Sequence, residues 1–167
     1  MVKDQDSHAS VSDMQERYHV TESELHDISQ LDVALSHLDD MHAQLNALRL
    51  VVKGPPEEEQ VKKEIDDFDK QISAERKTII SNAGAAESTL RVPDEIREHL
   101  FALDGLLEGA DDAPTAAALD QQKLLEPQYQ STLQKYNQFL ESELAAFNGK
   151  MAWHKIFSIT AGEPLQP

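Results

Sequence analysis

The sequence predicts an all-α protein, an elongated up-down antiparallel bundle of about four helices with an overlong first helix. The strongest observation is a stretch from Ser12 to Lys53 that contains neither glycine nor proline. Apolar residues recur through it at three- and four-residue steps, the spacing of one helix face. Such a helix would span roughly 60 Å at about 1.5 Å per residue. The second observation is that glycine and proline divide the remaining chain into amphipathic segments, which must cover the long helix.

The first helix is expected to be capped by Ser10 or Ser12 and to stop at Gly54-Pro55-Pro56. Between Leu31 and Leu45 its apolar steps alternate between four and three residues, a heptad pattern that indicates coiled-coil-like packing. The predicted buried stripe of this helix consists of Met14, Tyr18, Leu25, Ile28, Leu31, Leu35, Leu38, His42, Leu45, Leu48 and Val52.

Two shorter helices are expected next. The second opens at Pro56 with three glutamates that complement the helix dipole, and it ends at Asn82-Ala83-Gly84. The third runs from about Pro93 to Gly109. Short loops between consecutive helices favour antiparallel neighbours. The predicted core faces are Val61, Ile65, Phe68, Ile72 and Ile79 on the second helix, and Ile96, Leu100, Leu103 and Leu107 on the third.

The fourth helix is expected to begin after a cap at Thr115. Pro127 lies inside it and predicts either a kink or a break into a short and a long helix. Gly149 is expected to interrupt its end. The predicted organisation is a flexible N-terminal segment at 1–10, a single bundle domain at 11–157 and an irregular tail at 158–167. The stripe of the fourth helix is Leu119, Leu125, Tyr129, Leu133, Tyr136, Leu140, Leu144, Phe147 and Met151.

Composition excludes several classes of function. The chain has 167 residues, a formal net charge of -16 and no cysteine. The acidic charge argues against nucleic-acid binding, which needs a basic surface, and no apolar run is long enough for membrane insertion. The absence of cysteine removes disulfides, thiol catalysis and zinc–thiolate sites. No catalytic residue or cofactor is predicted.

Four residues are the only candidates for a metal site. Di-iron bundles place inward carboxylates and Glu-x-x-His pairs on facing helices. Asp39 and His42 form an Asp-x-x-His on the first helix, and Glu95 and His99 lie four residues apart on the third. A second Glu-x-x-His is missing, so the sequence does not predict a metal site.

An apolar segment near the C-terminus is the candidate interface. Met151, Trp153, Ile156 and Phe157 fall within seven residues. Helix-stripe aromatics usually belong to a core, so this segment either folds back onto the bundle or docks on another domain as an interface anchor.

Two parts of the chain carry a resemblance to a known family. One is Leu31–Leu45. The other runs from Leu103–Thr115 through Leu133–Leu140 to Leu144–Asn148. Together they resemble the C-terminal helical region of bacterial sortilin-like proteins with BNR/Asp-box repeats, which are often labelled glycosyl hydrolases. The segment from Gly149 to Thr160 departs from the family's short ending.

The resemblance implies a parent protein in which a β-propeller precedes a helical tail, with periplasmic or secreted localisation. The Asp-box pattern Ser-x-Asp-x-Gly-x-Thr-Trp is absent here, so no catalytic residue of the family can be assigned to this sequence. The leading hypothesis is a non-catalytic structural or interaction domain whose partner is its own N-terminal β-propeller or another copy of itself. The alternatives are a free-standing coiled-coil adaptor that self-associates through the first helix, and a metal-binding four-helix bundle.

Overall fold

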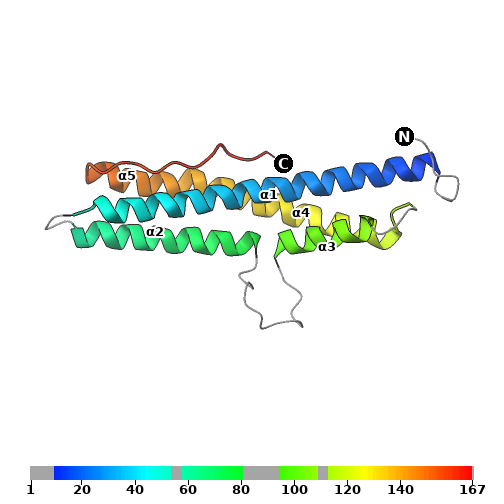
Figure 1. Cartoon of the computed structure of the whole chain (residues 1–167), viewed down its shortest axis with the longest axis horizontal. Coiled ribbons are helices and arrows are strands. Elements are labelled where there is room, and N and C mark those ends of the chain that lie inside the picture. Colours follow the sequence, from blue (N-terminus) through cyan, green and yellow to red (C-terminus); the bar gives the residue numbers. More distant parts are fainter. Residues whose placement is uncertain (1–9, 54–57, 81–94, 109–112, 167) are drawn as a thin grey trace, which may run out of the picture.

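The structure, a computed structural model, describes residues 10–53, 58–80, 95–108 and 113–166 (Figure 1). All regular elements in these ranges are helical and the first is by far the longest, which confirms the predicted all-α bundle. The predicted stops at Gly54-Pro55-Pro56, Asn82-Ala83-Gly84 and Gly109, and the start at Pro93, lie outside the described residues. The elements are α1 (Val11–Val51), α2 (Glu58–Ile79), α3 (Ile96–Glu108), α4 (Ala116–Phe139), the π-helical segment η1 (Leu140–Leu144) and α5 (Ala145–Trp153).

The helices α2 and α3 lie end to end along α1, one covering each half of it (Figure 1). The rod formed by α4, η1 and α5 then returns along the full length of the bundle. This arrangement differs from the expectation that each helix folds back beside its predecessor. Because α3 continues in the direction of α2, the N-terminal half of α1 packs against α3 and α4 instead of extending without a partner.

The start of α1 is fixed by a reciprocal pair of hydrogen bonds. The Asp13 amide donates to Ser10 Oγ at 3.1 Å, and the Ser10 amide donates to Asp13 Oδ2 at 2.8 Å. This capping box satisfies two backbone donors that the first helical turn leaves without partners. Of the two caps that the sequence allowed, Ser10 is the one used.

The buried face of α1 differs from the predicted stripe at several positions. Leu25 is 49% exposed, and the side chain of His42 is half exposed. The neighbouring Glu24 and Met41 are buried in their place. The predicted stripe is therefore displaced by one residue at these positions. The buried positions themselves alternate between four- and three-residue steps along the whole helix: Val20, Glu24, Asp27, Leu31, Ala34, Leu38, Met41, Leu45 and Leu48. Tyr18, at 53% exposure, is a further error of the same kind.

Aromatic residues from three helical segments form the centre of one half of the core. The ring of Phe68 stacks on Phe147, with centroids 4.4 Å apart, and on Phe139 at 5.7 Å. Tyr129 and Tyr136 of α4 are fully buried. Such rings bury large apolar areas, so they fix α2 against the returning rod.

Of the two alternatives predicted at Pro127, a kink or a break, the break is wrong, because α4 runs without interruption from Ala116 to Phe139. A proline removes one backbone donor and crowds the preceding turn. In that turn Gln128 Nε2 donates to the carbonyl of Leu124 at 3.0 Å. The helix also continues through Gly149, contrary to expectation. The irregularity lies instead at η1, where the π-helical turn accommodates one extra residue.

The end of α5 is a Schellman motif without glycine. The Ile156 amide donates to the carbonyl of Met151 at 2.9 Å, and the Lys155 amide to that of Ala152 at 3.0 Å. Lys155 has φ of 60°, a left-handed conformation that glycine usually supplies. After this turn the described part of the tail is irregular and runs back along the bundle beside α1 (Figure 1). No helix among the described residues is long and apolar enough to cross a bilayer.

Candidate interaction surface

Large apolar side chains are exposed at the end of the bundle where α1 and α5 finish. Trp153 is 71% exposed and Phe157 82%. Leu50 and Val51, in the last turn of α1, are 74% and 66% exposed. Aromatic residues on a surface are typical anchors of protein–protein interfaces. We refer to these four residues as the aromatic end.

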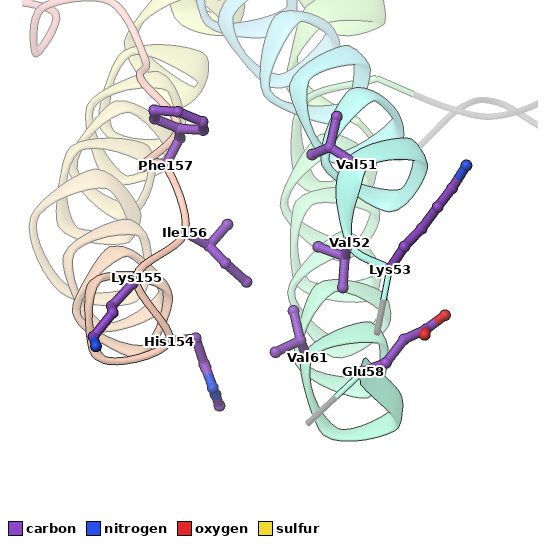
Figure 2. Close-up of a pocket in the computed structure, with 9 residues that line it drawn as sticks. All are labelled: Val51, Val52, Lys53, Glu58, Val61, His154, Lys155, Ile156 and Phe157. Atoms are coloured by element: carbon purple, nitrogen blue, oxygen red, sulfur yellow. The ribbon is translucent and has the colours of Figure 1, made fainter. Parts of the chain in front are cut away.

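A cavity of about 310 Å³ opens beside the aromatic end (Figure 2). Figure 2 shows Val52, Val61 and Ile156 directed toward one another across it, with Phe157 at one edge. The charged groups of Lys53, Lys155 and Glu58 point away from this apolar interior. The cavity therefore combines apolar walls with a rim of both charge signs, a composition that suits another protein surface.

The structure separates the four residues predicted as an interface into two groups. Met151 is fully buried, and Ile156 packs against the core at the end of the Schellman motif. Met151 is therefore a core residue rather than part of an exposed surface. Trp153 and Phe157 remain exposed, so an interface through them stays a prediction.

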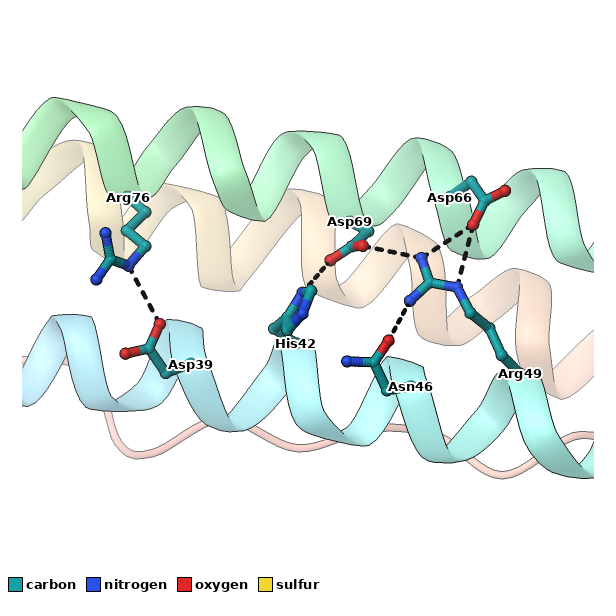
Figure 3. A network of polar contacts seen from close by, with 7 residues as sticks. All are labelled: Asp39, His42, Asn46, Arg49, Asp66, Asp69 and Arg76. Atoms are coloured by element: carbon teal, nitrogen blue, oxygen red, sulfur yellow. Dashed lines mark hydrogen bonds and ion pairs between the residues drawn. The ribbon is translucent and has the colours of Figure 1, made fainter. Parts of the chain in front are cut away.

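The four metal candidates are not brought together. Asp39 Oδ1 accepts a hydrogen bond from Arg76 Nε at 3.1 Å, and His42 Nδ1 lies 2.6 Å from Asp69 Oδ1 (Figure 3). Both residues therefore pair with α2, whereas Glu95 and His99 belong to the region of α3. Across residues 10–53, 58–80, 95–108 and 113–166, no group of three or more histidine, aspartate or glutamate side chains is placed to hold a metal ion.

The contacts of His42 and Asp39 belong to a polar network that joins α1 to α2 (Figure 3). The Arg49 guanidinium donates to Asp66 and Asp69 at 2.8 to 3.1 Å. Burial alone would raise the pKa of Asp69, but hydrogen bonds from Arg49 and His42 hold that pKa below its ordinary value. Exposed ion pairs contribute only about 0–1 kcal/mol each, so this network orients the helices more than it stabilises them.

Two carboxyl groups are buried between α1 and the rest of the bundle. Glu24 is 2% exposed and Asp27 6%. Burial, reinforced by their mutual repulsion and by Glu126, raises the pKa of Glu24 to about 7. Burial and the charge of Glu126 raise the pKa of Asp27 to about 6. Both groups can therefore change charge within the physiological range.

Sequence reasoning missed this pair although a signal was present. Val20, Glu24, Asp27 and Leu31 follow one another at three- and four-residue steps, which places both carboxyls on the buried face. Burial and the nearby carboxylates of Asp27 and Glu126 also raise the pKa of Tyr129. The predicted stripe of α1 included only one polar residue, His42, and so left both carboxyls out although the spacing places them on the buried face.

Comparison with known proteins found no matching family model, no similar curated protein and no similar solved structure.

Proposed function

We propose that this chain is a non-catalytic helical domain that associates with a second copy of itself through the aromatic end. The exposure of Trp153 and Phe157 beside a cavity lined in part by Val52, Val61 and Ile156 carries the proposal. In a dimer with two-fold symmetry, both copies contribute the same surface patch to the interface, so the patch must be complementary to a second copy of itself. Here each copy offers a protruding ring and a cavity of about 310 Å³ able to receive one.

Charge supports this location for the contact. The chain carries a net charge of -16, so two copies repel each other over most of their surfaces. The rim of the cavity is different, because Lys53, Lys155 and Glu58 all line it, with Lys155 on the side opposite Glu58 (Figure 2). Mixed charges allow the rims of two copies to pair with opposite signs.

In the parent protein that the family resemblance implies, the domain would follow a β-propeller, and pairing of two domains would hold two propellers together. Any hydrolase activity would then belong to the propeller, and this segment would have none. A propeller of the same polypeptide is the other partner that the aromatic end could contact.

The adaptor alternative, self-association through the heptads of α1, is less well supported. Leu31, Leu38 and Leu45 are fully buried by the chain's own helices. Pairing through that seam would require the bundle to open first, exposing a core whose burial is the main source of stability. The metal-binding alternative is not supported, because Asp39 and His42 pair with α2 and no group of three or more histidine, aspartate or glutamate side chains in the described ranges is placed to hold a metal ion.

Analytical ultracentrifugation over a concentration series tests the proposal. The wild-type chain should form dimers at high concentration, and the association should strengthen with salt as the repulsion is screened. The double variant Trp153→Ser, Phe157→Ser should remain monomeric. The matched control is Leu106→Ser, Leu124→Ser, which removes two residues with 60% and 67% exposure on α3 and α4.

A monomer at every concentration would overturn pairing with a second copy. Equal loss of association in both double variants would show that general surface hydrophobicity, and not the aromatic end, drives it. Circular dichroism of each variant establishes that the helices are intact. Separately, glycosidase turnover by the purified chain would refute the non-catalytic assignment.

A further inference from the structure

Three side-chain amides hold the C-terminal tail against the bundle, and each one pairs with both polar groups of a single tail residue. Asn148 of α5 donates to the carbonyl of Ile159 and accepts from its amide, both at 2.9 Å. Gln44 of α1 forms the same pair with Thr160, at 2.8 and 2.9 Å. We refer to residues 158–166 as the strap, and to the surface beneath it as the channel.

The third pair lies farther along the strap. Asn137 of α4 donates to the carbonyl of Leu165 at 2.7 Å and accepts from its amide at 2.9 Å. These contacts reproduce the two-bond exchange between residues of adjacent β-strands, with side-chain amides replacing the second strand. In an extended chain, neighbouring residues turn their polar groups to opposite sides. Thr160 therefore faces α1, while Ile159 faces α5.

The spacing of the amides fits an extended segment. Asn137 and Asn148 are eleven residues apart along the returning rod, which corresponds to roughly 16 Å of helix. The strap residues that they hold are six residues apart, which corresponds to roughly 20 Å of extended chain. The strap is therefore nearly, but not fully, extended between these two anchors.

The channel restricts which side chains the bound segment can carry at a few positions. Ile159 is 3% exposed, and Leu165 packs against the core from a partly buried position. Between them Gly162 crosses the ring of His37, where an added Cβ would lie 1.9 Å from His37 Nε2. The position of that ring is fixed by a hydrogen bond, because His37 Nδ1 lies 2.6 Å from the Tyr136 hydroxyl. Thr160 Oγ1 also donates to Gln44 Oε1 at 3.5 Å, and Ala161 packs against the core from a partly buried position. The three amide pairs contact the strap backbone and are independent of its side chains.

The channel also continues past the resident strap. A hollow of about 560 Å³ lies on α4 beside Asn137, lined by Gln130, Gln134 and Gln138. The strap runs antiparallel to α4, since Ile159 pairs with Asn148 and the later Leu165 with the earlier Asn137. A longer segment would reach this hollow at Gln134, whose side-chain amide lies one turn before Asn137, whereas Gln130 already donates to Glu126 Oε1 at 2.9 Å.

From these contacts we infer that the channel between α1 and α4–α5 is a binding site for extended segments of other proteins, with the strap as its resident, displaceable occupant. The segment recognised has an apolar residue, a glycine three positions later and a second apolar residue three positions after that. The strap closes the site from within the same molecule, so binding requires its release. This inference does not depend on the pairing proposed for the aromatic end.

Peptide binding to a strap-released full-length variant tests the inference. The changes Ile159→Asp, Gly162→Leu and Leu165→Asp all lie on the strap and leave every channel residue in place. The probe is a fluorescein-labelled peptide with the wild-type sequence of residues 157–166, followed by fluorescence anisotropy. We expect saturable binding to the released variant and binding at least tenfold weaker to the wild-type chain, whose strap competes at an effective concentration of about millimolar.

Two controls make the result specific. A probe carrying Gly162→Leu should not bind, because its side chain would collide with His37. In the released chain, Gln44→Ala should weaken binding about tenfold, whereas Gln15→Ala, an exposed amide elsewhere on α1, should leave it unchanged. The inference is overturned if the folded released variant binds no probe at millimolar concentration, or if it binds no better than wild type.

Hydrogen exchange of the wild-type chain gives an answer even if the released variant does not fold. The amides of Ile159, Thr160 and Leu165 should exchange through local opening, far faster than the amides buried in α1 and α4. If these three amides exchange only when the whole protein unfolds, the strap is not displaced in the folded state and the inference is overturned. Dimerisation provides a further outcome. If the strap-released variant does not dimerise but the double variant Trp153→Ser, Phe157→Ser still does, the channel binds the strap of a second copy. That result would overturn the inference that it binds a segment of another protein.

Discussion

Replacing Glu24 by glutamine should stabilise the protein at alkaline pH and have almost no effect in acid. The pKa of Glu24 rises from an ordinary 4.5 to about 7 because the group is buried. Between these values the folded state binds more protons than the unfolded state, so the free energy of unfolding falls as pH rises. At about 1.4 kcal/mol per pKa unit, the loss is roughly 3 kcal/mol once Glu24 has ionised.

Glutamine has the shape of the neutral carboxyl and cannot ionise, so the variant avoids that loss. Urea unfolding followed by circular dichroism should give equal stabilities for variant and wild type near pH 4, and a variant more stable by about 2–3 kcal/mol at pH 8. Glu16→Gln, exposed on the same helix, is the control and should show no such difference. A Glu24→Gln effect that is the same at both pH values would refute the buried-charge argument.

Three further substitutions follow from local geometry, each measured by the urea midpoint. Lys155→Gly should raise stability by about 0.5–1 kcal/mol, because glycine adopts the left-handed conformation without strain. Pro127→Ala should raise it by at least about 1 kcal/mol, since it restores a backbone donor at an exposed helical position. Asp69→Asn should cost about 1 kcal/mol at pH 7, and progressively less as the Asp69 carboxyl of the wild-type chain becomes protonated in acid. Asp69 has a lowered pKa, so its stabilising charge is lost as pH falls through that value.

Periodicity was enough to predict the fold class, the overlong first helix and most core positions. These follow from local spacing, which a sequence displays directly. Whether α3 packs beside α2 or continues beyond it could not be derived in the same way. Both arrangements bury the same face of α3, and the choice depends on the long-range packing of α3 against α1 and α4.

The surface features were harder to predict for different reasons. The Schellman turn at Lys155 has no glycine to mark it, and Asn137, Gln44 and Asn148 look like ordinary polar residues on separate helices. Only folding brings their amides onto one strap. The buried Glu24 was predictable in principle, because it occupies a stripe position between Val20 and Leu31.

The π-helical turn has a consequence for how this protein tolerates changes in length. Along the returning rod, the buried positions Tyr136, Leu140 and Leu144 follow at two successive steps of four, and the step to Phe147 is three. Removing one residue within η1 would restore a regular α-helix with its apolar side facing inward. The same deletion would rotate and shift Asn148 relative to Gln44, so the two amides could no longer both pair with the strap. The core could therefore tolerate the shorter helix, whereas the contacts that hold the strap would be lost.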